Sequence, residues 1–178
     1  ISYGISQFTH RSGSLYAVVR HYLENSGRVG RTILIDNLTL LRSPSVNAIL
    51  TAAANSRLKN ALRAAAVTRE MRASQHAVAF QRYLRPAIEV CGGSGFVQPL
   101  SLAVVYDSIN HGSWEMVRNR VRLDRRRVPA ESFEKRWITE YVKKRHEWLR
   151  GVPRLKVTSY RTAFFLAKAG QMAKGGVK

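Results

Sequence analysis

The feature that most constrains the fold of this chain is an acidic residue on the apolar face of a predicted helix. The segment 99–112 begins with a proline and ends with a glycine, which are typical of a first helical turn and a C-cap. At helical spacing Leu100, Val104 and Asp107 share one face. A carboxylate on the core side of a helix is costly unless a cation pairs with it. The fold must therefore bring a partner to Asp107.

Two arginines occupy equivalent positions in later helices. Arg145 lies on the apolar stripe of a helix predicted at 131–149, and Arg161 lies on the stripe of a helix predicted at 153–169. A single arginine in such a position commonly extends its charged end to water. Because three helices each place one charge on the core side, with complementary signs, we predict a shared buried network. In it Asp107 accepts hydrogen bonds from one or both guanidinium groups.

The predicted network has one negative and two positive groups. It therefore leaves a surplus of positive charge in a region of low dielectric constant. The remaining acidic residues of the chain mostly fit exposed or helix-capping positions. The chain also starts without methionine, directly in the strand-like stretch 1–9. We expect the sequence to be part of a longer polypeptide, with a second acid upstream of Ile1.

The rest of the chain is predicted to be mostly helical. After the strand at 1–9, Ser14 is a candidate N-cap for a helix that runs to Gly27. The apolar stretch 32–41 fits either a helix or a strand. Residues 46–91 are expected to form two or three helices, with a break at Asn55–Ser56 and a kink or restart at Pro86, and residues 92–95 a helix cap and hinge. The helices predicted after this hinge span 99–111, 113–122, 131–149 and 153–169.

Composition bounds the class of protein. With 178 residues, 45% of them hydrophobic, the chain fits one globular domain of two lobes. Cys91 is the one cysteine, and the histidines lack metal-ligand spacing, so we expect no disulfide, metal or cofactor. No apolar run is long enough to predict a membrane span. The formal charge of +19 favours polyanionic partners. A possible contact for an anionic polymer is the arginine-rich segment: Arg118, Arg120, Arg122, Arg125, Arg126 and Arg127.

The order of several short motifs resembles the chitosanases of glycoside hydrolase family 46. These are YDSINHG at 106–112, then W-x₃-Y-x₃-R-x₂-WL from Trp137, then TSYRTAFF at 158–165. The opening ISYGISQFTHRSGS is similar to the hairpin of that family. The resemblance covers essentially the whole chain. It implies a mainly α, lysozyme-like fold (α+β), with two helical lobes around a cleft and a short β-hairpin at the N-terminus.

The resemblance also implies an activity. The family consists of inverting endo-glycosidases that act on β-1,4-linked amino-sugar chains, using one carboxyl as acid and a separated carboxylate as base. By this resemblance both carboxyls lie upstream of Ile1, so residues 1–178 are a single chitosanase-like domain that lacks its first helix and catalytic loop. We expect these residues alone to be inactive.

The residues that remain are implied to support catalysis. Ser2 matches a hydroxyl that positions the attacking water, and Asp107, Arg145 and Arg161 match an ion network beneath the catalytic Glu. Tyr3, His10 and Ser14 in the hairpin region are implied to bind substrate.

Ser14 departs from the family pattern, which usually has an aspartate there to bind a substrate amine. Because +19 also repels a cationic polymer, we expect an N-acetylated or anionic glycan, such as peptidoglycan, rather than chitosan. Such a protein would be secreted, in the bacterial cell envelope or phage-associated. Two alternatives stay open: a non-catalytic glycan-binding or structural domain of a larger assembly, and a basic nucleic-acid-binding helical domain.

Overall fold

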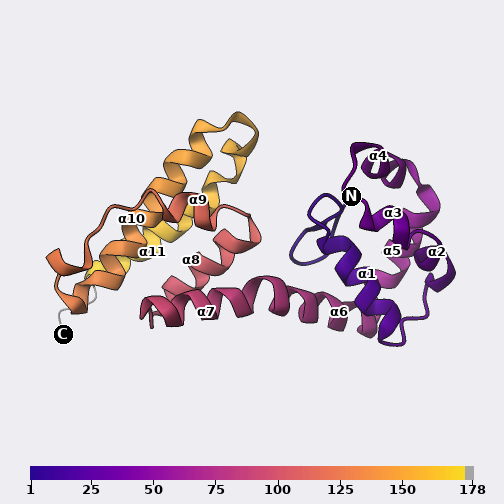
Figure 1. The fold of residues 1–178 in the computed structure, drawn as a ribbon, viewed down its shortest axis with the longest axis horizontal. Coiled ribbons are helices and arrows are strands. Elements are labelled where there is room, and N and C mark those ends of the chain that lie inside the picture. Colours follow the sequence, from indigo (N-terminus) through magenta and orange to yellow (C-terminus); the bar gives the residue numbers. More distant parts are fainter. Residues whose placement is uncertain (175–178) are drawn as a thin grey trace. The chain divides into compact units, whose positions relative to one another are not determined.

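The computed structural model describes residues 1–174, with side chains to residue 170. The chain forms two compact units, Ile1–Arg82 (unit 1) and Tyr83–Lys178 (unit 2), and each is described by itself. Apart from one hairpin, the described elements are helices (Figure 1). The predicted mainly α fold with an N-terminal hairpin is therefore confirmed.

The hairpin consists of β1 (Ser2–Tyr3) and β2 (Phe8–Thr9), paired antiparallel with Ser2 opposite Thr9. The stretch predicted as one strand at 1–9 is thus two short strands around a turn. Gly4 starts this turn with φ 70°, and a side chain at its Cβ would collide with the amide of Gln75. Glycine is favoured here by its backbone conformation, and the Gln75 amide occupies the space that a side chain would need.

Unit 1 packs its remaining helices around a core that includes Val18, Leu58, Leu62 and Met71. Its helices are α1 (Ser14–Glu24), α2 (Arg31–Asp36), α3 (Leu38–Arg42), α4 (Val46–Ala54), α5 (Ser56–Ala66) and α6 (Arg69–Ala79). The ambiguous stretch 32–41 is helical, divided into α2 and α3. The predicted break at Asn55 is confirmed, because its side chain accepts a hydrogen bond from the N–H of Leu58 and caps α5.

Pro86 changes the helix that contains it rather than ending it. A proline has no N–H to donate to the carbonyl four residues earlier, here that of Arg82. The structure has a π-helical turn, η1 (Phe80–Leu84), immediately before α7 (Arg85–Ser94). The expectation of two or three helices between 46 and 91 was therefore wrong: this region has four, α4, α5, α6 and α7, with the wider π turn between the last two. The division between the two units lies inside this turn.

The predicted helix cap at 92–95 is confirmed. Gly95 is the C-cap of α7 with φ 68°, and the N–H of Phe96 donates to the carbonyl of Cys91 at 2.9 Å. A hinge at this position stays a prediction, and the division between units lies earlier, at Arg82–Tyr83.

Unit 2 is built on three long helices and several short ones. Besides α7 they are α8 (Pro99–Asn110), α9 (Trp114–Arg118), η2 (Arg125–Arg127), α10 (Ala130–Gly151), η3 (Pro153–Ser159) and α11 (Tyr160–Lys174). Two predicted bounds were wrong: the helix at 113–122 stops at Arg118, and the one at 153–169 starts with the 3₁₀ segment η3. The core includes a cluster of aromatic rings, formed by Phe96, Trp114, Trp137 and Tyr141. Among the described helices none is both long and apolar enough to cross a membrane.

Candidate functional site

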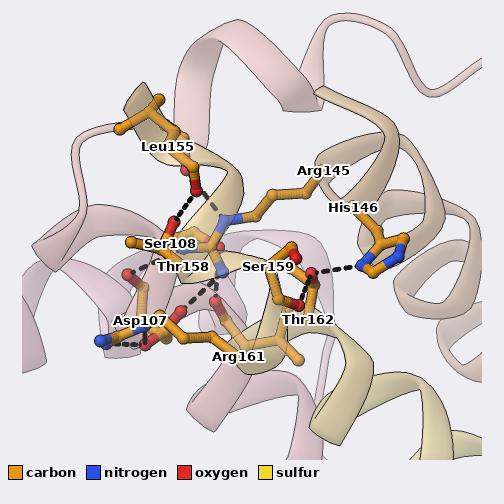
Figure 2. A network of polar contacts seen from close by, with 11 residues as sticks. Asp107, Ser108, Arg145, His146, Leu155, Thr158, Ser159, Arg161 and Thr162 are labelled. Carbon is orange, nitrogen blue, oxygen red and sulfur yellow. Dashed lines mark hydrogen bonds and ion pairs between the residues drawn. The ribbon is translucent and has the colours of Figure 1, made fainter. Parts of the chain in front are cut away.

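The centre of unit 2 holds a cluster of three ionised side chains, one from each long helix. Oδ2 of Asp107 on α8 lies 2.6 Å from Nη1 of Arg145 on α10. Oδ1 of Asp107 accepts from Nε of Arg161 on α11 at 2.9 Å, and also from its Nη2. Figure 2 shows both arginines directed at this one carboxylate. We call Asp107, Arg145 and Arg161 the ion cluster; the contact predicted from helical spacing is present.

The two arginines differ in exposure. Arg145 is fully buried, and its Nε donates to Oγ of Ser113 at 3.0 Å while Nη2 donates to the carbonyl of Asp107 at 3.4 Å. The side chain of Arg161 is 30% exposed. The guanidinium of Arg145 is thus fixed by three acceptors inside the core, whereas that of Arg161 reaches toward solvent from the edge of the cluster.

Hydroxyl groups hold the start of α11 near the ion cluster. Oγ1 of Thr162 donates to the carbonyl of Ser159 at 2.8 Å and lies 2.8 Å from Nδ1 of His146 (Figure 2). Oγ1 of Thr158 donates to the carbonyl of Leu155 at 2.7 Å. These contacts fix the turn that precedes Arg161, so its guanidinium meets Asp107 in a defined geometry.

Glu134 on α10 positions α8, the helix that carries Asp107, and the sequence analysis did not predict this role. Its carboxylate accepts from the N–H of Val97 at 3.1 Å, the N–H of Gln98 at 2.7 Å and Oγ of Ser101 at 2.6 Å. An acid on α10 thereby satisfies free N–H groups at the start of α8 and interacts favourably with the helix dipole. This cap comes from a distant part of the chain, so local capping patterns contain no signal for it.

The charges of the cluster perturb the titration of its members. Burial alone would raise the pKa of Asp107, but the hydrogen bonds and charges of Arg161 and Arg145 outweigh it and lower this pKa below its ordinary value. The hydrogen bond to Asp107 raises the pKa of Arg161. Burial and the two arginines lower the pKa of His111, which favours its neutral form. Asp107 is therefore ionised at neutral pH, and His111 adds little positive charge.

The ion cluster keeps a net positive charge. Its one carboxylate faces two guanidinium groups, and among the described residues no second acid pairs with either arginine. A low-dielectric interior does not favour this surplus. The arrangement is suited to hold a further anionic group and to keep it ionised or to tune its pKa.

The hairpin residues predicted to meet substrate are placed differently from one another. Ser2 is exposed on β1, where its hydroxyl is accessible. The hydroxyl of Tyr3 donates to the carbonyl of Leu62 at 2.9 Å, and burial with the nearby Tyr22 raises its pKa to about 12. Tyr3 thus ties the hairpin to α5.

His10 and Ser14 are both buried, each only 1% exposed. Nε2 of His10 lies 3.0 Å from the carbonyls of Leu40 and Ser43, which can only accept, so this nitrogen carries a proton. Oγ of Ser14 accepts from the N–H of Thr9 at 2.9 Å. This burial argues against direct contact of either side chain with a glycan. The prediction that Ser14 is the N-cap of α1 was wrong, since the N-cap residue is Gly13.

The arginine-rich segment is largely exposed, as an anion contact requires. Arg125 lies over the ring of Phe133, 5.2 Å from its centroid, and Arg127 pairs with Asp124 at 3.6 Å. In the part of the chain with described side chains, no group of three or more histidine, cysteine or acidic residues is placed to hold a metal ion.

Comparison with known proteins gives one family. The family model described as glycosyl hydrolase family 46 matches residues 1–167. No curated protein matches in a sequence search. The fold is similar to that of a solved Gynuella sunshinyii GH46 chitosanase in complex with chitotetraose (TM-score 0.78, 21% identity, 98% of this chain and 75% of that chain covered).

The fold is also similar to that of a mutant chitosanase of Bacillus subtilis MY002 complexed with 6 GlcN (TM-score 0.74, 20% identity, 96% of this chain and 74% of that chain covered). The native enzyme from the same strain matches with a TM-score of 0.72 and 19% identity. At these identities the structural matches show the fold.

Proposed function

The chain belongs to glycosyl hydrolase family 46, and from this premise we propose that it forms a chitosanase-like domain that hydrolyses internal bonds of a β-1,4-linked amino-sugar glycan with inversion. The resemblance drawn from the sequence and its implied lysozyme-like fold agree with the family match and the solved chitosanases. No match favours the two alternatives, a non-catalytic domain or a nucleic-acid-binding domain.

The observation that carries the proposal is the surplus positive charge of the ion cluster. An inverting glycosidase needs a carboxyl that protonates the leaving oxygen. The surplus charge attracts such a carboxyl and orients it, and it lowers the pKa of the carboxyl from the raised value that burial alone would give. We propose that the catalytic Glu belongs to a segment upstream of Ile1 in the parent polypeptide and lies beside Arg145 and Arg161. The guanidinium of Arg145, fixed by Asp107 and Ser113, then orients this carboxyl.

Ser2 has a separate role in the proposal. Inversion requires room for a water molecule between the two carboxyls, on the opposite face of the sugar from the acid. The exposed hydroxyl of Ser2 is suited to hold this water for an upstream Asp that acts as the base. The Ser2→Ala variant of the intact domain is expected to lower kcat with little change in KM, because the glycan is bound by other groups.

The substrate follows from the relatives and from the charge. The solved relatives are described with 6 GlcN and with chitotetraose, so the substrate class is an amino-sugar polysaccharide. Within this class we propose an N-acetylated or anionic glycan, because a formal charge of +19 repels a cationic polymer. Such a substrate places the protein outside the cytoplasm, as a secreted, cell-envelope or phage-associated enzyme.

The test measures reducing-end release from peptidoglycan and from chitosan at moderate salt. It compares residues 1–178 with the same chain joined to its natural upstream segment. The longer protein is expected to cleave and to release products of inverted anomeric configuration, observed by NMR, whereas residues 1–178 are expected to bind without cleavage. Cleavage by residues 1–178 alone would show that the acid lies within them. Binding without cleavage by both proteins would support the non-catalytic alternative.

A second experiment tests the ion cluster in the longer protein. Arg161→Gln removes a cation near the proposed acid, so the pKa of this acid is expected to rise and the alkaline limb of the kcat/KM profile to move to higher pH. Arg161→Lys keeps the charge and is the matched control. An unchanged profile in Arg161→Gln would separate the ion cluster from catalysis.

A further inference from the structure

Unit 2 has a surface groove that the proposed hydrolase chemistry does not use. It lies where α11 packs beside α10, and the segment that follows α9 completes its lining (Figure 1). Its volume is about 640 Å³. We call it the basic groove, because four cationic side chains line it: Arg122, Lys135, Arg136 and Lys143. None of them belongs to the ion cluster.

The cations of the basic groove lack acidic partners within the described part of the chain. None of the four forms an ion pair there, and Arg122, Arg136 and Lys143 are exposed. The one acid in the lining, Glu140, lies 3.8 Å from Nζ of Lys144, a residue outside the lining. Four cations around one concave surface repel one another, and a bound polyanion would relieve this repulsion.

The rest of the lining indicates what kind of polyanion fits. It is mainly aliphatic, provided by Leu123, Leu166 and Ala169 with Thr139 and Gly170 beside them, and no aromatic ring is among the described residues of the lining. Single-stranded nucleic acids are usually bound by stacking bases on aromatic side chains, so a basic groove without such rings is poorly suited to bases. Aliphatic side chains between cations instead suit a thin chain of methylene groups that carries charges at regular intervals.

We propose that the basic groove binds a linear phosphodiester polymer without bases, of the poly(glycerol phosphate) type. Lys135, Arg136 and Lys143 lie on one side of α10, and the eight helical steps from Lys135 to Lys143 span about 12 Å along the helix axis. A run of cations of this length contacts successive phosphates of an extended chain. Arginine forks bind phosphate oxygens in pairs, and lysines add point charges.

The test measures binding of fluorescently labelled poly(glycerol phosphate) to residues 1–178 across a range of salt concentrations. The variant Arg136→Gln/Lys143→Gln removes two exposed cations of the groove. The control Arg150→Gln/Arg154→Gln removes two exposed cations of unit 2 that do not line the groove, with the same loss of charge. An unchanged melting temperature, followed by tryptophan fluorescence, verifies that both variants fold.

The groove variant is expected to weaken binding and to reduce the slope of log affinity against log salt by roughly 1.4, about 0.7 for each lost phosphate contact. The control is expected to change the slope by less than half as much. Equal losses in the two variants would overturn the proposal, because they would show attraction to the overall charge alone.

Competition experiments identify the polymer. Unlabelled poly(glycerol phosphate) is expected to displace the probe at lower concentration than single-stranded DNA, duplex DNA or polygalacturonate of equal charge. Stronger displacement by either DNA would assign the groove to nucleic acid, and stronger displacement by polygalacturonate would assign it to acidic sugars. Either result contradicts the proposal, and neither depends on glycosidase activity.

Discussion

Each unit contains a cluster of polar groups that includes buried side chains, and the two clusters satisfy these buried groups in different ways. In unit 1 the hydroxyls of Thr9, Ser12 and Ser14 form a closed set, which we call the hydroxyl cluster. Thr9 Oγ1 donates to Ser12 Oγ at 2.8 Å, Ser12 Oγ lies 2.8 Å from Ser14 Oγ, and Ser14 Oγ accepts from the N–H of Thr9. Unit 2 buries ions instead.

The difference shows which cluster is able to act on another molecule. A hydroxyl both donates and accepts, so three of them satisfy one another without a net charge. The ion cluster contains two groups that only donate and one that only accepts, and its charges do not cancel. The hydroxyl cluster therefore explains the shape of the hairpin, whereas the ion cluster is the better candidate for chemistry.

The largest loss of stability is expected for Asp107→Ala. This variant leaves two guanidinium groups without their carboxylate, one of them fully buried, and is expected to cost roughly 3–5 kcal/mol of unfolding free energy. The three tryptophans of the chain all belong to unit 2, so their fluorescence during denaturant unfolding reports on this unit. The control Asp124→Ala breaks an exposed pair with Arg127 and is expected to cost less than about 1 kcal/mol. A similar small loss for Asp107→Ala would remove the distinction between the clusters.

Acid should destabilise unit 2 through the same residue. The folded-state pKa of Asp107 is lowered, so its stabilising contribution is fully present above the ordinary value of 3.8 and is lost as the pH falls below it. Unfolding followed by tryptophan fluorescence is expected to require less denaturant as the pH decreases through this range. In Asp107→Ala the stability of unit 2 is expected to depend less on pH. If it depends on pH as strongly as in the wild type, groups other than Asp107 cause the acid destabilisation.

A smaller effect is expected in the hydroxyl cluster. Ser14→Ala removes the acceptor of the Thr9 N–H and is expected to cost about 1–2 kcal/mol, within the range for an unsatisfied buried donor. Hydrogen exchange of the hairpin amides measures this effect in unit 1. Ser12→Ala is the matched control: because Ser12 is exposed, water replaces its hydroxyl, and a loss below about 0.5 kcal/mol is expected. Equal losses in both variants would show that the cluster acts as one unit.

The smallest effect is expected for Tyr3→Phe, about 0.5–1.5 kcal/mol at neutral pH from the lost bond to Leu62. The folded-state pKa of Tyr3 is raised to about 12, so its contribution is present below the ordinary value of 10.0 and is lost as the pH rises through 12. Hydrogen exchange at these pH values is too fast to follow, so circular dichroism in denaturant is the measurement. The wild type is expected to lose more stability across this range than Tyr3→Phe. The same behaviour in Tyr16→Phe would contradict a specific role of Tyr3.

Helical spacing was sufficient to predict the ion cluster from the sequence. Asp107, Arg145 and Arg161 each interrupt an apolar stripe, and burial of the stripes brings the three charges together. The cap at Asn55 and the end of α7 at Gly95 were also predictable, because each depends on neighbouring residues alone.

The failures have a common physical cause. Glu134 caps a helix more than 30 residues away, and His10 binds carbonyls 30 and 33 residues along the chain. Such partners are chosen by tertiary packing, which local patterns do not contain. The π turn before Pro86 was also not predictable from the spacing of apolar residues. A proline indicates only that the hydrogen bonding of the helix must change there.

The hairpin also sets an order of events during synthesis. Its N–H at Ile5 donates to Oε1 of Gln75 at 3.0 Å, and the carbonyl of Ser12 accepts from Nη2 of Arg82 at 3.2 Å. These contacts join residues 70 positions apart, and closing so long a loop costs chain entropy. On the ribosome, residues 1–12 therefore emerge well before their partners on α6 and η1. The hairpin residues are made before the helix residues that they contact, so they are among the last of unit 1 to reach their final positions, and until then the hairpin strands are open to pairing with other chains.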